Sequence, residues 1–149
     1  MVGQNLGAKE LKRAEDSVWK VAKYNGIFMG IVSIIFLLFA KQLIGLINDE
    51  VQVVATGTLA LQIISLGYVF YGIGMTLMNA FNGAGDSKTQ TLINLFWYWV
   101  FQVPIAYFVA IHLQWHSIGV FLAILITEIL IAITSIIIFK KGKWKTVKI

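Results

Sequence analysis

The most constraining feature of this sequence is a stretch, residues 51–85, that contains no Asp, Glu, Lys or Arg. About 20 mostly apolar residues cross the hydrocarbon core of a bilayer as a helix, which rises about 1.5 Å per residue. The stretch exceeds that length, so we expect a transmembrane helix that tilts or protrudes. Transmembrane strands would instead give alternating segments of about ten residues. Only 13% of the chain is charged, against roughly 25% in ordinary soluble domains. The sequence therefore predicts an all-α, polytopic membrane protein.

The sparse charges divide the chain into three regions. Residues 1–23 are predicted to form a cytoplasmic connection with an interfacial amphipathic helix, because apolar side chains recur there at helical spacing between charged ones. A basic cytoplasmic tail is expected at residues 140–149. Pro104 lies inside the third predicted span, where the loss of a backbone hydrogen bond predicts a kink. The transmembrane region, residues 24–139, contains four predicted spans, at about 24–47, 51–81, 91–113 and 118–139.

The distribution of basic residues predicts the orientation in the membrane. All but one of the 12 lysines and arginines lie in the N-terminal segment, the second connection or the C-terminal tail. The exception is Lys41, at the end of the first span. By the positive-inside rule we expect both termini in the cytoplasm. The net charge of +5 is therefore attributed to orientation, and the expected partner is membrane lipid rather than nucleic acid.

Motifs that would carry catalysis are scarce. The chain has no cysteine, which excludes disulfides and thiolate metal sites. His112 and His116 have a spacing that can serve a metal, but they straddle a helix end without a third ligand. Gly83-Ala84-Gly85 has no following Lys-Ser/Thr pair in the spacing of a phosphate loop and no preceding strand. We therefore predict no enzyme, no metal site and no cofactor.

Four sets of short motifs occur in order along the chain. Together they resemble segments of the multidrug and toxic compound extrusion (MATE) transporters: the connection before the third helix of a lobe, the glycine-rich turn after the fourth, the helix that comes next, and the start and exit of the last helix. Each glycine motif is weak by itself, but their order and spacing agree over nearly the whole chain. The motifs are Val2-Gly3-Gln4-Asn5-Leu6-Gly7-Ala8 followed by Ala14-Glu15; Asn82-Gly83-Ala84-Gly85-Asp86-Ser87-Lys88-Thr89; Asn94 with Pro104-Ile105-Ala106-Tyr107; and Gly119-Val120-Phe121 with Gly142-Lys143-Trp144-Lys145.

The resemblance implies a part of a larger transporter. The family has two six-helix lobes, and this chain would correspond to the last four of twelve helices, with the first eight as missing partners. Met1-Val2 opens within a motif that lies inside family chains, so we expect a fragment. The parent would be an antiporter in the plasma membrane, the inner membrane of a bacterium, that exports small organic, often cationic, compounds by alternating access. Its coupling ion would be Na+ or H+.

Two other functions remain open. A lipid-linked oligosaccharide flippase from the same superfamily is a near alternative, although the tail and the glycine-rich turn favour the exporter. The other alternative is a stand-alone four-helix membrane protein that acts as an assembly or partner subunit. An upstream reading frame that encodes eight more spans would exclude it.

Glu128 is the most unusual residue of the predicted spans because it lies near the middle of the fourth. An acidic residue at a helix centre costs about 2.5 to 3.5 kcal/mol on translocon scales, so it should face the bundle or an aqueous cavity, be paired or be protonated. Glu128 is either an ion-coupling carboxylate or a side chain that locks helices together. The resemblance favours coupling, because family members often carry an acidic residue near this point.

Polar and small side chains share one face of the second predicted span. Gln62, Ser65, Thr76 and Asn79 are candidates for lining a substrate cavity, although interhelical hydrogen bonding explains the pattern at least equally well. Tyr71 joins them because it stands where some cation-coupled family members have an acidic residue, which is a departure from their ion site. Alternating spacings of four and three define the full face, which comprises Thr58, Gln62, Ser65, Val69, Gly72, Thr76 and Asn79.

The third predicted span has a polar face of its own. Asn94, Tyr98 and Gln102 recur every four residues and are further cavity-lining candidates. Pro104, just beyond them, is a hinge candidate. Ordinary helix packing explains the same pattern and is favoured by the residues alone.

Overall fold

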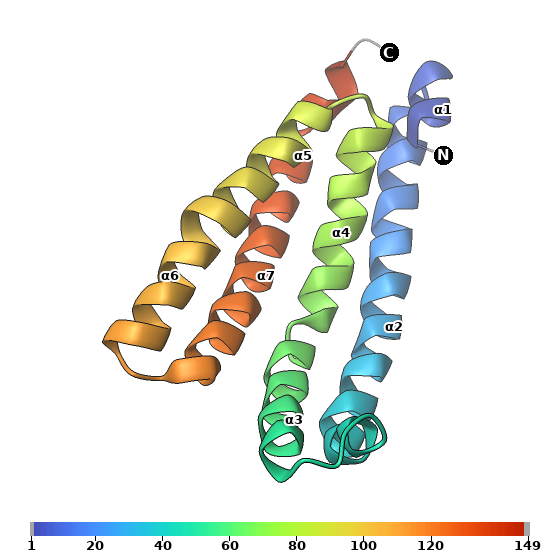
Figure 1. Ribbon diagram of the computed structural model, residues 1–149. Helices are drawn as coiled ribbons and strands as arrows, with labels where there is room; N and C mark the ends of the chain where they lie inside the picture. Colours follow the sequence, from blue (N-terminus) through green and yellow to red (C-terminus); the bar gives the residue numbers. More distant parts are fainter. Residues whose placement is uncertain (1, 148–149) are drawn as a thin grey trace.

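A computed structural model describes residues 2–147, which form a bundle of helices (Figure 1). No strand occurs within these residues, which confirms the predicted all-α class. Two segments of the fold, η1 and η2, are π-helical, and η3 is a 3-10 turn. The elements in chain order are α1 (Val2–Gly7), α2 (Leu11–Gly45), α3 (Val51–Ser65), α4 (Tyr68–Gly83), α5 (Ser87–Asn94), η1 (Leu95–Gln102), α6 (Val103–Tyr107), η2 (Phe108–His112), α7 (His116–Lys141) and η3 (Lys143–Thr146).

Length and hydropathy identify the candidate membrane spans. Within the part of the chain that the structure describes, three helices are long and apolar enough to cross a bilayer, namely Leu11–Gly45, Ser87–His112 and His116–Lys141. The pair α3 and α4 makes a fourth span if the two helices are counted together. The prediction of a polytopic helical membrane protein is therefore confirmed.

The second span is broken rather than straight. The axes of α3 and α4 differ by 53°, whereas the sequence predicted one tilted or protruding helix. Gly67 lies at the break, where an added Cβ would approach a Leu125 methyl carbon to 3.1 Å. Side chains take over part of the interrupted backbone pattern: Ser33 Oγ donates to the Ser65 carbonyl at 2.7 Å, and Ser65 Oγ to the Gln62 carbonyl at 2.9 Å. The break is thus built from a glycine and two serines.

The amphipathic N-terminal stretch is the beginning of α2 and not a separate interfacial helix. Its apolar residues Ala14, Val18 and Ala22 are buried. Ala14 and Val18 belong to the same core cluster as Leu77 and Phe81 of α4. Ala14 and Val18 of the predicted apolar face therefore pack against another helix, whereas Leu11 and Val21 of the same face are exposed.

The third span alternates between α-helical and π-helical winding around Pro104. This proline is the second residue of α6, and π-helical segments η1 and η2 flank α6 on both sides. Residues Ser87–His112 nevertheless continue as one helix. The wider winding gives the local irregularity expected where proline removes a backbone donor.

One end of the bundle holds an aromatic cluster, Trp19, Phe81, Phe139 and Trp144. Phe139 stacks on Trp144 with ring centroids 4.7 Å apart and an angle of 13°. The rings of Trp19 and Phe81 approach Phe139 at 5.5 Å and 6.0 Å. Figure 1 shows α1, the first turns of α2, the end of α7 and η3 together at this end, with α4 between α2 and α7. The cluster therefore joins the first helices to the C-terminal turn.

Candidate functional site

Glu128 lies in the interior of α7 and is partly buried. The phenolic hydroxyl of Tyr98 donates a hydrogen bond to Glu128 Oε1 at 3.0 Å. Tyr98 comes from η1, so the bond joins the π-helical part of the third span to the last helix. Glu128 and Tyr98, two separate candidates in the sequence, are therefore direct partners.

A cavity of about 460 Å³ lies beside Glu128. Its walls come from four helices, which places the carboxylate at the meeting point of α2, α3, α4 and α7. The lining is mainly apolar and aromatic, and Glu128 is its acidic group. Tyr71, a sequence candidate, belongs to the same wall. The lining residues are Phe28, Met29, Val32, Ile64, Tyr68, Tyr71, Ile124 and Glu128.

The break of the second span lies against the same part of α7. A Cβ added at Gly67 would lie 3.7 Å from the Cβ of Glu128. Ile64, at the end of α3, and Tyr68, at the start of α4, both line the cavity. The carboxylate, the cavity and the broken span thus form one site. Sequence reasoning missed the contribution of Gly67, although a glycine inside a long apolar run was a usable signal.

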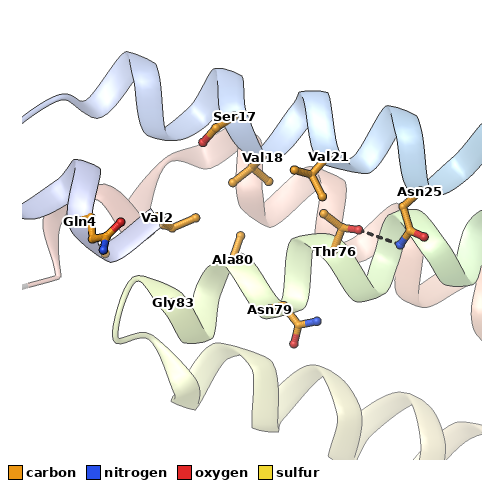
Figure 2. A pocket seen from close by; sticks show the side chains of 11 residues that line it. Val2, Gln4, Ser17, Val18, Val21, Asn25, Thr76, Asn79, Ala80 and Gly83 are labelled. Atoms are coloured by element: carbon orange, nitrogen blue, oxygen red, sulfur yellow. Dashed lines mark hydrogen bonds between the residues drawn. The ribbon is translucent and has the colours of Figure 1, made fainter.

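The polar residues of the second span do not lie in one site. Gln62 donates to the Leu37 carbonyl at 3.3 Å, and Ser65 is buried with its hydroxyl bonded within α3. Neither belongs to the lining of the Glu128 cavity. Thr76 and Asn79 instead line a second cavity of about 660 Å³ between α1, α2 and α4 (Figure 2).

Asn25 is a cavity residue that the sequence analysis did not identify. Its Nδ2 donates to the Gly72 carbonyl at 2.9 Å and to Thr76 Oγ1 at 3.1 Å. Figure 2 shows the second of these bonds, between two residues that line the second cavity. An amide at the start of the first charge-free run was the available signal. The bonds of Asn25 tie α2 to α4 where Gly72 brings the helices close.

The polar face of the third span has unsatisfied atoms. Asn94 Oδ1 and Gln102 Oε1 are buried and have no hydrogen-bond partner. They lie one helical turn on either side of Tyr98, whose hydroxyl does have a partner. Pro104 is exposed in α6. This span therefore contributes Tyr98 to the site directly, and the structure brings neither Asn94 nor Gln102 into the cavity lining.

Residues 2–147 contain no cluster of potential metal ligands. No group of three His, Cys, Asp or Glu side chains among them could hold a metal ion. The site is therefore a single carboxylate with a phenol partner in an aromatic cavity.

Together, these features define a helical membrane protein with a broken span beside a partly buried carboxylate, an architecture typical of secondary transporters. The family model described as MatE matches residues 1–108. The chain belongs to the MatE family, as its sequence motifs suggested.

Two comparisons give the extent of the similarity. The chain is 23% identical over 128 residues to the uncharacterized transporter YisQ of Bacillus subtilis (strain 168), a match that covers 86% of this chain and 28% of YisQ. The crystal structure of the Vibrio cholerae MATE transporter VcmN in the bent form matches with a TM-score of 0.86 and 23% identity, over 95% of this chain and 32% of VcmN. The chain therefore has the fold of part of a MATE transporter and spans under a third of the length of these relatives.

Proposed function

We propose that this chain is part of a cation-coupled multidrug antiporter that exports small organic, often cationic, compounds by alternating access. The observation that carries the proposal is the position of Glu128, in the wall of a cavity beside the broken span. In transporters, discontinuous helices lie where substrates and coupling ions bind near the bilayer midplane. The MatE family membership agrees with this assignment.

The coupling role of Glu128 rests on its exchange of partners. An empty, ionised carboxylate accepts the hydrogen bond from Tyr98. A proton or Na+ on the carboxylate neutralises the charge that strengthens this hydrogen bond and weakens the link between α7 and η1. Loading then favours a different arrangement of the two helices, which is the differential affinity that coupling requires.

The cavity suits an organic cation in size and lining. Its volume of about 460 Å³ is within the range of about 300 to 1,000 Å³ of small-molecule sites. Phe28, Tyr68 and Tyr71 supply aromatic faces, which attract cations through their quadrupoles. The carboxylate of Glu128 adds a full negative charge when it is not loaded. Tyr71 thus contributes to substrate binding. Its phenol does not supply the negative charge of the acidic residue that some cation-coupled family members have at this position.

The proposal also covers the helices that precede this chain, its membrane and its orientation. The chain would act with eight preceding helices, as the last four of twelve, and the comparison with VcmN agrees because the match covers 32% of that protein. We place the protein in the plasma membrane, the inner membrane of a bacterium, with lipid around the bundle. The basic residues favour both termini in the cytoplasm.

The test is Glu128→Gln in the full-length protein, with Glu50→Gln as the matched control. Glu50 is exposed at the start of α3, so its substitution removes an equal charge away from the cavity. Efflux of a fluorescent organic cation from vesicles is measured under an imposed Na+ or pH gradient. We expect Glu128→Gln to abolish ion-dependent efflux and Glu50→Gln to retain it, at equal amounts of membrane protein. Unchanged efflux with unchanged ion dependence in Glu128→Gln would refute the coupling role, and loss of the protein from the membrane would favour a packing role.

A further inference from the structure

Three exposed lysines lie at the C-terminal end of the last helix. Lys140 and Lys141 close α7, and Lys143 follows in η3; all three side chains are exposed. We call them the lysine cap. Ile133 and Ile137, which are 46% and 50% exposed, lie on the same face of α7 because residues three and four apart are neighbours on a helix. An exposed apolar surface therefore leads directly into a cluster of positive charge.

The lysine cap is held in place by the fold. Gly142 ends α7 in the left-handed conformation, with φ of 73°, and returns the chain toward the bundle. Trp144 is then buried, stacked on Phe139, with its Nε1 donating to the Phe139 carbonyl at 3.0 Å. Lys145 pairs with Glu15 of α2. Lys143 therefore directly precedes two anchored residues, so less conformational entropy is lost when it binds an anion.

No acidic side chain of residues 2–147 neutralises the cap. The ion pair found in this part of the chain joins Lys145 to Glu15 and involves none of the three lysines. Three unpaired lysines at one helix end attract an anion of several oxygen atoms, such as a phosphate group.

We propose that the lysine cap binds the phosphate of an anionic phospholipid, whose acyl chain lies along Ile133 and Ile137. Ile133 to Lys141 spans about 12 Å at 1.5 Å per residue, which fits within one leaflet of about 15 Å. The exposed apolar face favours a lipid over free phosphate, because only a lipid has an acyl chain that can contact this face. This inference requires a membrane-embedded bundle and does not depend on the transported substrate or ion.

The experiment compares two triple variants of the full-length protein. Lys140→Gln/Lys141→Gln/Lys143→Gln removes the cap. Lys12→Gln/Lys20→Gln/Lys23→Gln removes as many exposed charges from the N-terminal turns of α2. Each protein is placed in nanodiscs of phosphatidylcholine with phosphatidylglycerol, and the phosphatidylglycerol that stays bound after extraction is counted by native mass spectrometry.

We expect the cap variant to retain phosphatidylglycerol at least about tenfold less well than the unaltered protein, since each lysine near an anionic surface contributes roughly a fivefold gain. The α2 variant should lose much less, and added inorganic phosphate should not displace the lipid. Equal losses in both variants would mean diffuse attraction and would overturn the site, as would displacement by free phosphate.

A second measurement needs no substitution and keeps the proposal testable if the cap variant fails to fold. The unaltered protein is irradiated with a photoactivatable phosphatidylglycerol, and the labelled peptides are mapped. Labelling concentrated at residues 133–143 supports the proposal. Labelling spread evenly over the basic residues of α2 and α7 overturns it.

Discussion

Replacement of Trp144 by alanine should loosen the C-terminal turn from the bundle. Trp144 is 1% exposed and stacks on Phe139 at 4.7 Å. Truncation of a buried aromatic residue to alanine costs about 3 to 5 kcal/mol. Because η3 lies beyond the last span, this magnitude from water-soluble proteins applies here. We expect Trp144→Ala to lower the free energy of unfolding by about that amount.

Trp144→Phe separates the stacking from the hydrogen bond. It keeps an aromatic ring against Phe139 and removes the Nε1 donor. The Phe139 carbonyl also accepts from the Gly142 amide at 3.1 Å, so this carbonyl stays satisfied. The loss should therefore lie between that of one ordinary hydrogen bond, about 0.5 to 1.5 kcal/mol, and that of truncation to alanine, because the smaller ring also leaves a cavity.

Unfolding in mixed detergent micelles, followed by far-ultraviolet circular dichroism, compares the two variants with the unaltered protein. Trp115→Ala is the control, because Trp115 is more than half exposed in the connection before α7. The reasoning would be refuted if Trp144→Ala were no more destabilising than Trp115→Ala. It would also fail if Trp144→Phe were as damaging as Trp144→Ala.

Three further predictions concern other contacts of the bundle. Tyr98→Phe removes the hydroxyl that donates to the carboxylate of α7. It should lower the unfolding free energy by about 0.6 kcal/mol, the average for hydrogen bonds between membrane helices, and by no more than about 1.7 kcal/mol; an unchanged unfolding curve would contradict this. Gly119→Ala places a Cβ 2.8 Å from a valine methyl carbon and 3.0 Å from a backbone nitrogen, so overpacking should cost about 1 to 3 kcal/mol. Gly45→Ala, which meets nothing within 4 Å, should show no such loss in the same unfolding assay. Lys145→Gln breaks the partly exposed ion pair with Glu15 and should cost no more than about 1 kcal/mol; thermal unfolding at low and high salt should show the difference only at low salt.

Hydropathy alone was sufficient to predict the helical membrane class, because long charge-free runs have few structural solutions in lipid. It could not predict the break at Gly67. The run around this glycine is free of charged residues, and the break is bridged by Ser33, which lies 32 residues before its partner Ser65. A contact between distant segments leaves no periodic signal in either of them.

The candidate site was predictable in its parts and not in its assembly. Glu128 stood out because an acidic side chain inside a span is costly, and Tyr98 because of its polar neighbours on the helix. Their hydrogen bond joins residues 30 positions apart and depends on how η1 packs against α7. The π-helical winding that presents Tyr98 has no sequence pattern of its own beyond the proline that follows it.

The central position of α4 has a consequence for how the chain is made. Asn25 of α2 bonds to the Gly72 carbonyl on one side of α4, and Gly74 on the other side lies against the backbone of Ala132 in α7. During synthesis α2 emerges before α4, and α7 emerges after it. One face of α4 can therefore pack as soon as the helix enters the membrane, whereas its opposite face stays in contact with lipid or the insertion machinery until the ribosome has translated α7. Mutations in α7 that weaken the contact at Ala132 should therefore act first on biogenesis, as slower acquisition of protease resistance, before they change the finished bundle.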